Sequence, residues 1–172
     1  MRSTLSNSCQ VKVNIAFTER IVIIMRISTK SRYGLAAITY IGQNYRDGEL
    51  ITVIRISEKF GFSKIYLEQT FSLLKRAGLV MSAKGPQGGY QLTREPDQIT
   101  LFDVLYAIES TLFDETEETV SEKDIALEMA MQECVFNPIN GIIRDMLQQI
   151  TIYDLIVKTE KCRGMTDTMY FI

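Results

Sequence analysis

The segment SKIYLEQTFSLLKRAGLVMSAKGPQGGYQLT, from Ser63 to Thr93, carries the strongest fold signals in the sequence. Its first residue is a good helix cap, and Leu67, Phe71 and Leu74 then recur at steps of four and three, the spacing of a buried helix face. Gly78 ends the expected helix, and the runs LVMSA and YQLT that follow are typical of β-strands. The segment therefore predicts a helix followed by a β-hairpin.

The residues before this segment predict two more helices. Thr52 caps a short helix whose apolar face includes Ile56 and whose stop signal is Gly61, and Ser28 or Thr29 caps an earlier one. The residues GFS between the second and third helices match the spacing of a helix-turn-helix, a signal that other helical hairpins share. A hairpin directly after a helix-turn-helix is the order of a winged helix, and this order favours that fold.

We therefore predict a mainly α fold in three parts. A winged helix-turn-helix DNA-binding domain, with three helices and a two-stranded wing, occupies residues 25–98. Residues 99–172 supply C-terminal dimerisation helices and a partner-binding tail, because a small core gains stability by association. Residues 1–24 form an extension without a clear cap or turn, and Met25 is a hypothetical natural start.

The C-terminal part begins with Thr100, a good cap for the apolar run LFDVLYAIES. The acidic run DETEETVSEKD follows and is more typical of a solvated loop than of a specific site. Two amphipathic helices come next, the second with Asn137 as its cap and Pro138 in its first turn, and Thr151 with Asp154 begins a last helix. Long helices after a small domain predict a homodimer.

The composition excludes several classes of protein. The 172 residues are 46% hydrophobic and 23% charged, as in soluble globular proteins, and the longest apolar run, residues 21–25, is far shorter than the roughly 20 residues of a membrane span. Without a secretory segment, we expect a cytoplasmic protein that does not contact a membrane. The sequence has no histidine, and its three cysteines form no C-x-x-C pair, so we expect no imidazole-based catalysis, no metal site and no enzyme activity.

Charge is divided unevenly along the chain. Residues 25–98 hold 11 Lys and Arg against 6 Asp and Glu, whereas residues 99–172 hold 5 against 14. The basic half is typical of a module that binds phosphates, and the acidic half of one that binds another partner. The third predicted helix also carries a mostly polar face opposite its buried stripe, made of Ile65, Glu68, Gln69, Ser72 and Arg76.

The loop KGPQGGYQL, residues 84–92, combines glycines with a lysine in the manner of a phosphate cradle. A Walker loop places Lys-Ser/Thr after its last glycine and leads into a helix, whereas here the lysine comes first and a strand follows. The G-x-G-x-x-G pattern of dinucleotide sites is absent as well. A DNA-binding wing and a purely structural hairpin, in which glycine only permits positive φ, both stay open.

Four segments together resemble the winged-helix family of bacterial regulators typified by IscR, NsrR and CymR. They are MRISTKSRYGL, YLEQTFSLLKRAGLV, AKGPQGGYQLTREPDQITLFDVLYAIE and ITIYDLI, and the resemblance runs from Met25 to residue 172. It implies a homodimer that binds double-stranded DNA, with the third helix in the major groove and the wing in the adjacent minor groove.

The resemblance also implies roles for single residues. Glu68 and Gln69 correspond to base-reading positions; glutamine can pair with adenine and glutamate can accept from cytosine, although Glu68 by itself is typical of an exposed helix charge. Lys84 stands where the family wing often has arginine, so the charge is kept and the planar fork is lost. Implied phosphate contacts are Ser28, Thr29, Lys30, Arg32 and Tyr66. The whole predicted DNA-binding set is Ser28, Thr29, Lys30, Arg32, Ile65, Tyr66, Glu68, Gln69, Ser72, Arg76, Lys84, Gly85, Pro86, Gln87 and Gly88.

Family members that bind an iron–sulfur cluster carry three closely spaced cysteines after the helix that ends here at Glu109. Between Glu109 and Thr151 this sequence has only Cys134, and a cluster generally needs about four protein ligands, mostly thiolates. We therefore expect no iron–sulfur cluster and no other cofactor. Cys134 lies in an apolar helical pattern that is typical of a buried small hydrophobe, with a redox switch as the alternative.

The chain ends in DTMYFI, which we expect to follow the last helix after a short polar link. An exposed aromatic tail is costly, so it packs either on its own dimer or on a partner. The family's repressor of cysteine metabolism also lacks cluster cysteines and ends in an aromatic-rich segment with isoleucine. The resemblance implies that Met169, Tyr170, Phe171 and Ile172 bind cysteine synthase (O-acetylserine thiol-lyase), with the Ile172 carboxylate in the place of the amino-acid substrate.

The sequence thus predicts a transcription regulator, a repressor of cysteine or sulfur genes that acts with cysteine synthase. Two alternatives stay open. One is a regulator of the same fold that senses another signal, such as oxidation of Cys134. The other is a helical protein-interaction module that does not bind DNA.

Overall fold

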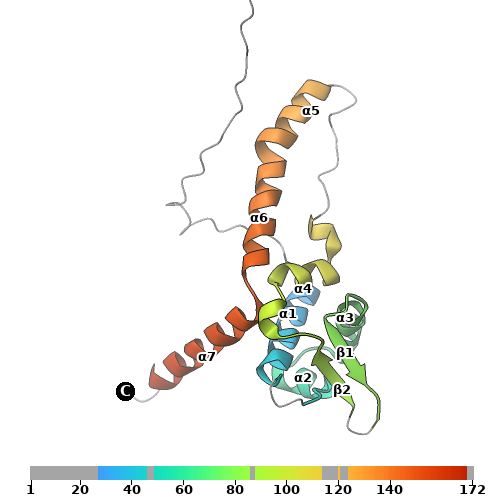
Figure 1. Cartoon of the computed structure of the whole chain (residues 1–172), viewed down its shortest axis with the longest axis vertical. Helices are drawn as coiled ribbons and strands as arrows, with labels where there is room; N and C mark the ends of the chain where they lie inside the picture. The colour runs from blue at the N-terminus through green and yellow to red at the C-terminus, as the bar shows by residue number, and fades with distance from the viewer. Residues whose placement is uncertain (1–26, 46–48, 86–87, 114–119, 121–123, 170–172) are drawn as a thin grey trace, which may run out of the picture.

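The computed structural model describes residues 27–45, 49–85, 88–113, 120 and 124–169, and the side chains of the last range as far as residue 165. A helical body with a two-stranded wing carries one long helical rod that projects away from it (Figure 1). The elements of the N-terminal part are α1 (Thr29–Gln43), α2 (Val53–Phe60), α3 (Lys64–Arg76), β1 (Val80–Ala83) and β2 (Gly89–Leu92). This order confirms the predicted winged helix-turn-helix.

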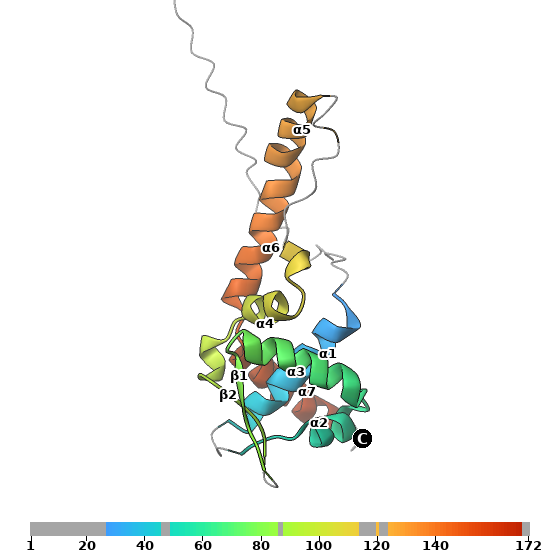
Figure 2. The same cartoon turned by 90° about the vertical axis from the view of Figure 1, so that its right-hand side faces the viewer.

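The C-terminal part begins with a 3-10 turn, continues through α4 and the rod, and ends in α7, which lies on the opposite side of α1 from α3 and the wing (Figures 1 and 2). Its elements are η2 (Pro96–Gln98), α4 (Leu101–Ile108), η3 (Ser110–Phe113), α5 (Ile125–Met131), the π-helical segment η4 (Gln132–Phe136), α6 (Asn137–Gln149) and α7 (Ile152–Met169). None of the helices described here is long and apolar enough to cross a membrane.

The predicted helix caps mostly act as expected. Ser28 and Thr52 each accept a hydrogen bond from a backbone N–H in the first turn of α1 and α2, and Gly61 ends α2 with a φ of 67°. Ser63 occupies the cap position of α3 with an extended backbone, but its side chain makes no capping hydrogen bond. The first turn of α3 is therefore fixed by packing more than by its cap.

The apolar stripe of α3 forms the centre of the core. Leu67, Phe71 and Leu74 are fully buried, and the Phe71 ring stacks on Tyr90 of β2 with 4.3 Å between ring centroids. The rest of the core comes from α1, α2, the wing, α4 and α7, and its fully buried members include Ala37, Ile38, Ile51, Ile56, Ile99, Val104 and Ile152. The apolar stripe predicted from the sequence thus packs α3 into the core, and the polar face of the helix points outward.

A single residue outside the two strands of the wing, Ile51, pairs with β2 as an isolated β-bridge. The Ile51 N–H donates to the Tyr90 carbonyl at 2.9 Å, and the Tyr90 N–H donates to the Ile51 carbonyl at 2.8 Å. Single-residue pairing of this kind leaves no alternating pattern, so the sequence did not predict it. It ties the segment before α2 to β2 and fixes the wing against the body.

The expected break before Asn137 is wrong, because α5, η4 and α6 form one continuous rod. Asn137 has helical φ and ψ of −61° and −45°, and its N–H donates to the carbonyl of Gln132, five residues back. Proline within a helix removes a hydrogen bond and crowds the carbonyl four residues earlier. The wider π turn directly before Pro138 accommodates this proline without ending the helix.

Two further expectations about the C-terminal part are wrong. Cys134 is exposed in this chain instead of buried, because it lies on the rod, which projects into solvent. The last helix continues to Met169, so no polar link separates it from the terminal residues. Glycine at position 164 weakens helix propensity without ending α7.

Candidate nucleic-acid interface

The outward face of α3 offers side chains with hydrogen-bonding capacity to a groove. Glu68, Gln69, Ser72 and Arg76 are exposed on this face, which lies opposite the buried stripe. Lys64 Nζ lies 3.8 Å from Glu68 Oε1, and both side chains are 56% exposed, so the ion pair is weak and yields readily to another partner. The first turn adds two exposed hydrophobic side chains, Ile65 and Tyr66.

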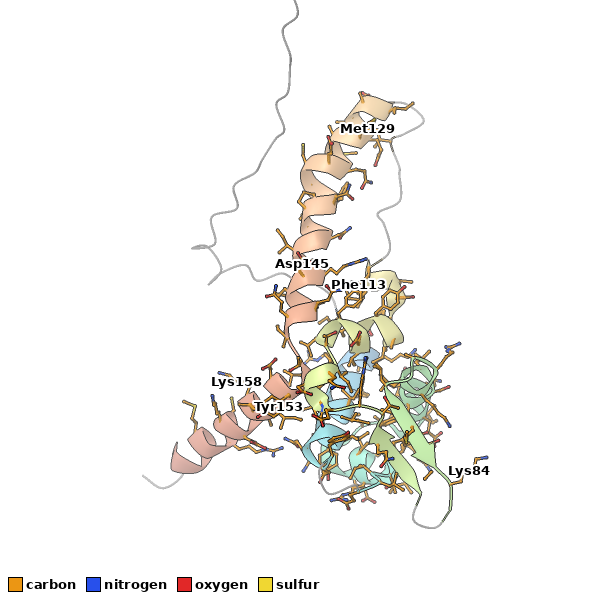
Figure 3. All side chains as sticks on the ribbon, in the orientation of Figure 1. Lys84, Phe113, Met129, Asp145, Tyr153 and Lys158 are labelled. Carbon is orange, nitrogen blue, oxygen red and sulfur yellow. The ribbon has the colours of Figure 1, made fainter. Side chains whose placement is uncertain are left out.

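The wing presents a lysine at its tip. Lys84 directly follows β1 and points away from the body (Figure 3). Its side chain is exposed, and Gly85 beside it has a φ of 119°. The Gly88 N–H donates to the Gly85 carbonyl at 2.9 Å, and a Cβ on Gly88 would lie 2.5 Å from the Ala83 carbonyl oxygen. Glycine is therefore required for this tight turn.

The wing and α3 lie on the same side of the molecule (Figures 1 and 2). Lys75 near the end of α3 donates from Nζ to Ser82 Oγ of β1 at 2.6 Å. This contact and the stacking of Phe71 on Tyr90 hold the hairpin in one orientation beside the helix. A helix face and a basic loop fixed side by side can engage two neighbouring grooves of one duplex.

The N-terminus of α1 supplies the third predicted group. Thr29 and Arg32 are exposed, whereas Lys30 is half-buried. Ser28 and Ser31 lie against the Glu109 carboxylate at the end of α4, and Ser31 Oγ donates to Glu109 Oε2 at 2.9 Å. Hydrogen bonds from Ser28 and then Ser31, together with the nearby charge of Lys30, lower the pKa of Glu109 below its usual 4.5. The backbone and side chains here favour negative charge.

The structure therefore brings the α3 residues and Lys84 of the wing to one side of the molecule, and their contact with DNA stays a prediction. Sequence reasoning missed Lys75, which holds the wing, because its partner Ser82 is brought near only by the fold. It also missed Arg55 and Lys59 of α2, whose cationic groups lie 5.8 and 4.8 Å from the centroid of the Tyr40 ring. Both residues were included in the count of charged residues in the basic half, but their spacing in the sequence did not set them apart from the other charged residues.

Several predicted residues lie outside the described part of the chain. Pro86 and Gln87 of the wing belong to this group, as do Tyr170, Phe171 and Ile172 of the tail. Met169 ends α7, and its side chain is not described either. Among the described residues, no group of three or more His, Cys, Asp or Glu side chains is arranged to hold a metal ion.

Known proteins with similar sequences are transcription regulators. Residues 27–158 match the Rrf2 family, described as iron-dependent transcriptional regulators. The regulator IscR of Aliivibrio salmonicida is 32% identical over 136 residues, which cover 79% of this chain and 80% of that protein. IscR of Cereibacter sphaeroides is 38% identical over 89 residues, 51% of this chain, and the chain spans only 57% of that relative's length.

Solved structures show the same fold. CymR, the global cysteine regulator of B. subtilis, aligns with a TM-score of 0.65 and 30% identity over 77% of this chain and 96% of that chain. IscR of T. potens aligns with a TM-score of 0.61 and 30% identity over 79% and 89%. The relatives are regulators without enzymatic activity, which confirms the prediction that the chain is no enzyme. The chain therefore belongs to the Rrf2 family of winged-helix transcriptional regulators.

Proposed function

We propose that this regulator binds DNA as a cytoplasmic homodimer, with α3 of each protomer in the major groove and each wing in the adjacent minor groove. The observation that carries the proposal is the exposed polar face of α3 fixed beside Lys84 by the Lys75–Ser82 hydrogen bond. Gln69 suits adenine and Glu68 suits the amino group of cytosine. The negative charge of Glu68 also repels phosphate, which penalises wrong registers.

The remaining predicted contacts act on the backbone of the duplex. Thr29, Lys30 and Arg32 lie in the first turn of α1, where backbone N–H groups and the helix dipole favour an anion. Tyr66 is 53% exposed on the first turn of α3 and supplies a hydroxyl for phosphate. We assign these residues to orientation of the protein on the duplex and the α3 face to sequence discrimination.

Salt-dependent binding of duplex DNA tests this proposal. We expect Gln69→Ala to weaken binding by about 1–3 kcal/mol for each half-site and to relax sequence preference at one base pair in each half-site. Lys84→Ala should weaken binding to all sequences and reduce the salt slope by about two, because one contact is lost in each half-site. Lys158→Ala is the matched control, because that exposed lysine lies on α7, away from the wing (Figure 3). If the protein binds no DNA sequence with an affinity that falls as the salt concentration rises, the proposal is contradicted.

An exposed stripe on the rod supports the homodimer. Val135, Ile139, Ile142 and Met146 recur at steps of four, three and four and are 44–49% exposed in the single chain. Leu147, on another side of α6, is buried. A repeat of this spacing is the seam by which two helices pack on one another. We infer that the rods of two protomers pair along this stripe.

We further propose that the chain regulates cysteine metabolism without a cluster and represses its genes together with cysteine synthase. The residues do not fit an iron–sulfur cluster: the sequence has no histidine, and Cys134 is the only cysteine between Glu109 and the start of α7. The likeness to CymR, the global cysteine regulator of B. subtilis, supports the metabolic role. Iron content and visible absorbance after anaerobic purification test the cluster, and a cluster stoichiometric with the protein would contradict this part of the proposal.

Cys134 supports a second candidate signal. Its thiol is exposed on the π-helical segment of the rod, so an oxidant can reach it in the single chain. Oxidation there would alter the helix that carries the dimer stripe. DNA affinity of Cys134→Ser before and after peroxide treatment tests this alternative: an equal response of the wild type and the variant removes it.

A further inference from the structure

An isoleucine stands at the N-terminal end of the outward face of α3. Ile65 is the second residue of the helix and is 69% exposed, more than any other exposed large hydrophobic side chain described between residues 27 and 113. Residues three, four and seven positions later in a helix share one face. Ile65 therefore lies among the polar side chains of Glu68, Gln69 and Ser72, where it contributes little to the core.

The first turn of a recognition helix is the part that most often meets base edges. The edges of the bases in the major groove are hydrogen-bond donors and acceptors with one apolar exception, the C5-methyl group of thymine. The same methyl group occurs on 5-methylcytosine. A branched aliphatic side chain at this position matches that methyl group and cannot satisfy any of the polar groups around it.

The side chain is also suited to a precise contact. Isoleucine is branched at Cβ and keeps mainly one χ1 rotamer in a helix, so it loses little freedom when a ligand group packs against it. Gln69 lies four residues further along, about 6 Å along the helix axis. Base pairs are stacked at intervals of about 3.4 Å. A methyl group under Ile65 therefore lies within about two base pairs of the base that Gln69 meets.

We propose, building on the DNA-binding mode proposed above, that Ile65 determines sequence specificity by packing against the C5-methyl group of a pyrimidine in each half-site. The group recognised is the methyl itself, on thymine or on 5-methylcytosine. Contact with one buried methyl group changes the affinity about four-fold for each half-site. Two half-sites of a symmetric dimer give about fifteen-fold.

Replacement of thymine by uracil tests the proposal, because uracil lacks only this methyl group. The full-length chain first selects its site from a randomised duplex library. Its affinity is then measured by fluorescence anisotropy at fixed salt for duplexes in which each symmetric pair of thymines, one in each half-site, is exchanged for uracil in turn. We expect one symmetric pair of positions at which uracil weakens wild-type binding about fifteen-fold. The Ile65→Ala variant should bind the thymine and uracil duplexes equally at that pair.

Cytosine and 5-methylcytosine at the same pair distinguish the sources of the methyl group. If the methyl alone is read, methylation improves wild-type binding and leaves Ile65→Ala unchanged; if only the uracil substitution has an effect, the contact is restricted to thymine. Ile54→Ala, which alters an exposed isoleucine on α2, should keep the full uracil penalty. Uracil penalties that are absent, or that are equal in wild type and Ile65→Ala, overturn the inference. Failure to bind the unmodified selected duplex removes the DNA-binding mode as well and is seen before any substitution.

Discussion

Ser31 Oγ donates to Glu109 Oε2 at 2.9 Å and so joins the first turn of α1 to the residue that ends α4. Ser31 is fully buried, and the two residues are 78 positions apart in the chain. The hydrogen bond therefore connects the end of α4 with the helix terminus that we propose to contact phosphate.

The Glu109 carboxylate makes stability depend on pH. Its hydrogen bonds with Ser28 and Ser31 lower its pKa in the folded state below the usual 4.5, so the unfolded chain binds more protons between the two values. The stabilisation is complete above pH 4.5 and is lost as the pH falls from there through the folded-state pKa. We expect Glu109→Gln to lower the free energy of unfolding by about 1 kcal/mol at pH 7 and to reduce its fall in acid. Urea unfolding between pH 3 and pH 7 is the measurement.

Glu58→Gln is the control for this comparison, because Glu58 is an exposed carboxylate on α2. That variant should follow the wild-type curve throughout the pH range. A Glu109→Gln curve parallel to that of the wild type, with the same acid slope, would show that the carboxylate is not stabilised in the folded state.

Gly34 is a second point at which α1 depends on close contact. A Cβ there would lie 2.2 Å from Ile108 Cδ1 and 3.0 Å from Thr70 Cγ2. We expect Gly34→Ala to destabilise the fold by about 1–3 kcal/mol through overpacking, although alanine favours a helix. Ile108→Val removes the crowding Cδ1 atom, so the double variant should lose less than the sum of the single losses. Urea unfolding of the four proteins measures this coupling.

Gly141 provides the matched control for Gly34. It lies in α6, and no atom lies within 4 Å of a Cβ built on it. Gly141→Ala should therefore raise the free energy of unfolding, by up to about 1 kcal/mol. If both glycine substitutions stabilise the protein, the tight packing of α1 on α4 does not require glycine at position 34.

The stripe on the rod predicts a variant that cannot dimerise. Ile139→Glu places a charge in the middle of the proposed seam, where two copies of the side chain would lose their burial. We expect the dissociation constant of the dimer to rise at least about 100-fold. Sedimentation equilibrium measures this, and Ile54→Glu, at an exposed isoleucine on α2, should leave the wild-type value unchanged. An Ile139→Glu protein that remains dimeric would place the interface elsewhere.

The sequence predicted the elements that depend on local patterns. The stripe of Leu67, Phe71 and Leu74 and the caps Thr52 and Thr100 each act within one or two turns, and the structure confirms them. Features that need contacts between distant segments could not be predicted this way, as with the Ile51 pairing to the wing.

In the rod, by contrast, a local sequence pattern predicted the wrong structure. Asn137-Pro138 is a typical helix start, but the widening of η4 to a π turn lets the proline stay inside a continuous helix. Cys134 is exposed in the single chain because it lies on the same rod. The apolar pattern around it predicts that this part of the helix packs against another surface, but it does not reveal whether that surface belongs to this chain or to a second copy.

The proposed partner predicts that the last residue decides complex formation. We expect deletion of Ile172 to abolish binding to cysteine synthase, because the terminal carboxylate would no longer take the place of the amino-acid substrate. A synthetic peptide of residues 167–172 should compete for the synthase with a free carboxylate and fail as the amide, and O-acetylserine should displace it. Lys84→Ala, which alters only the wing, should bind the synthase like the wild type. Calorimetry measures each of these interactions with the synthase. Unchanged affinity after the deletion would contradict the role of Ile172 and would indicate that the tail packs on its own dimer.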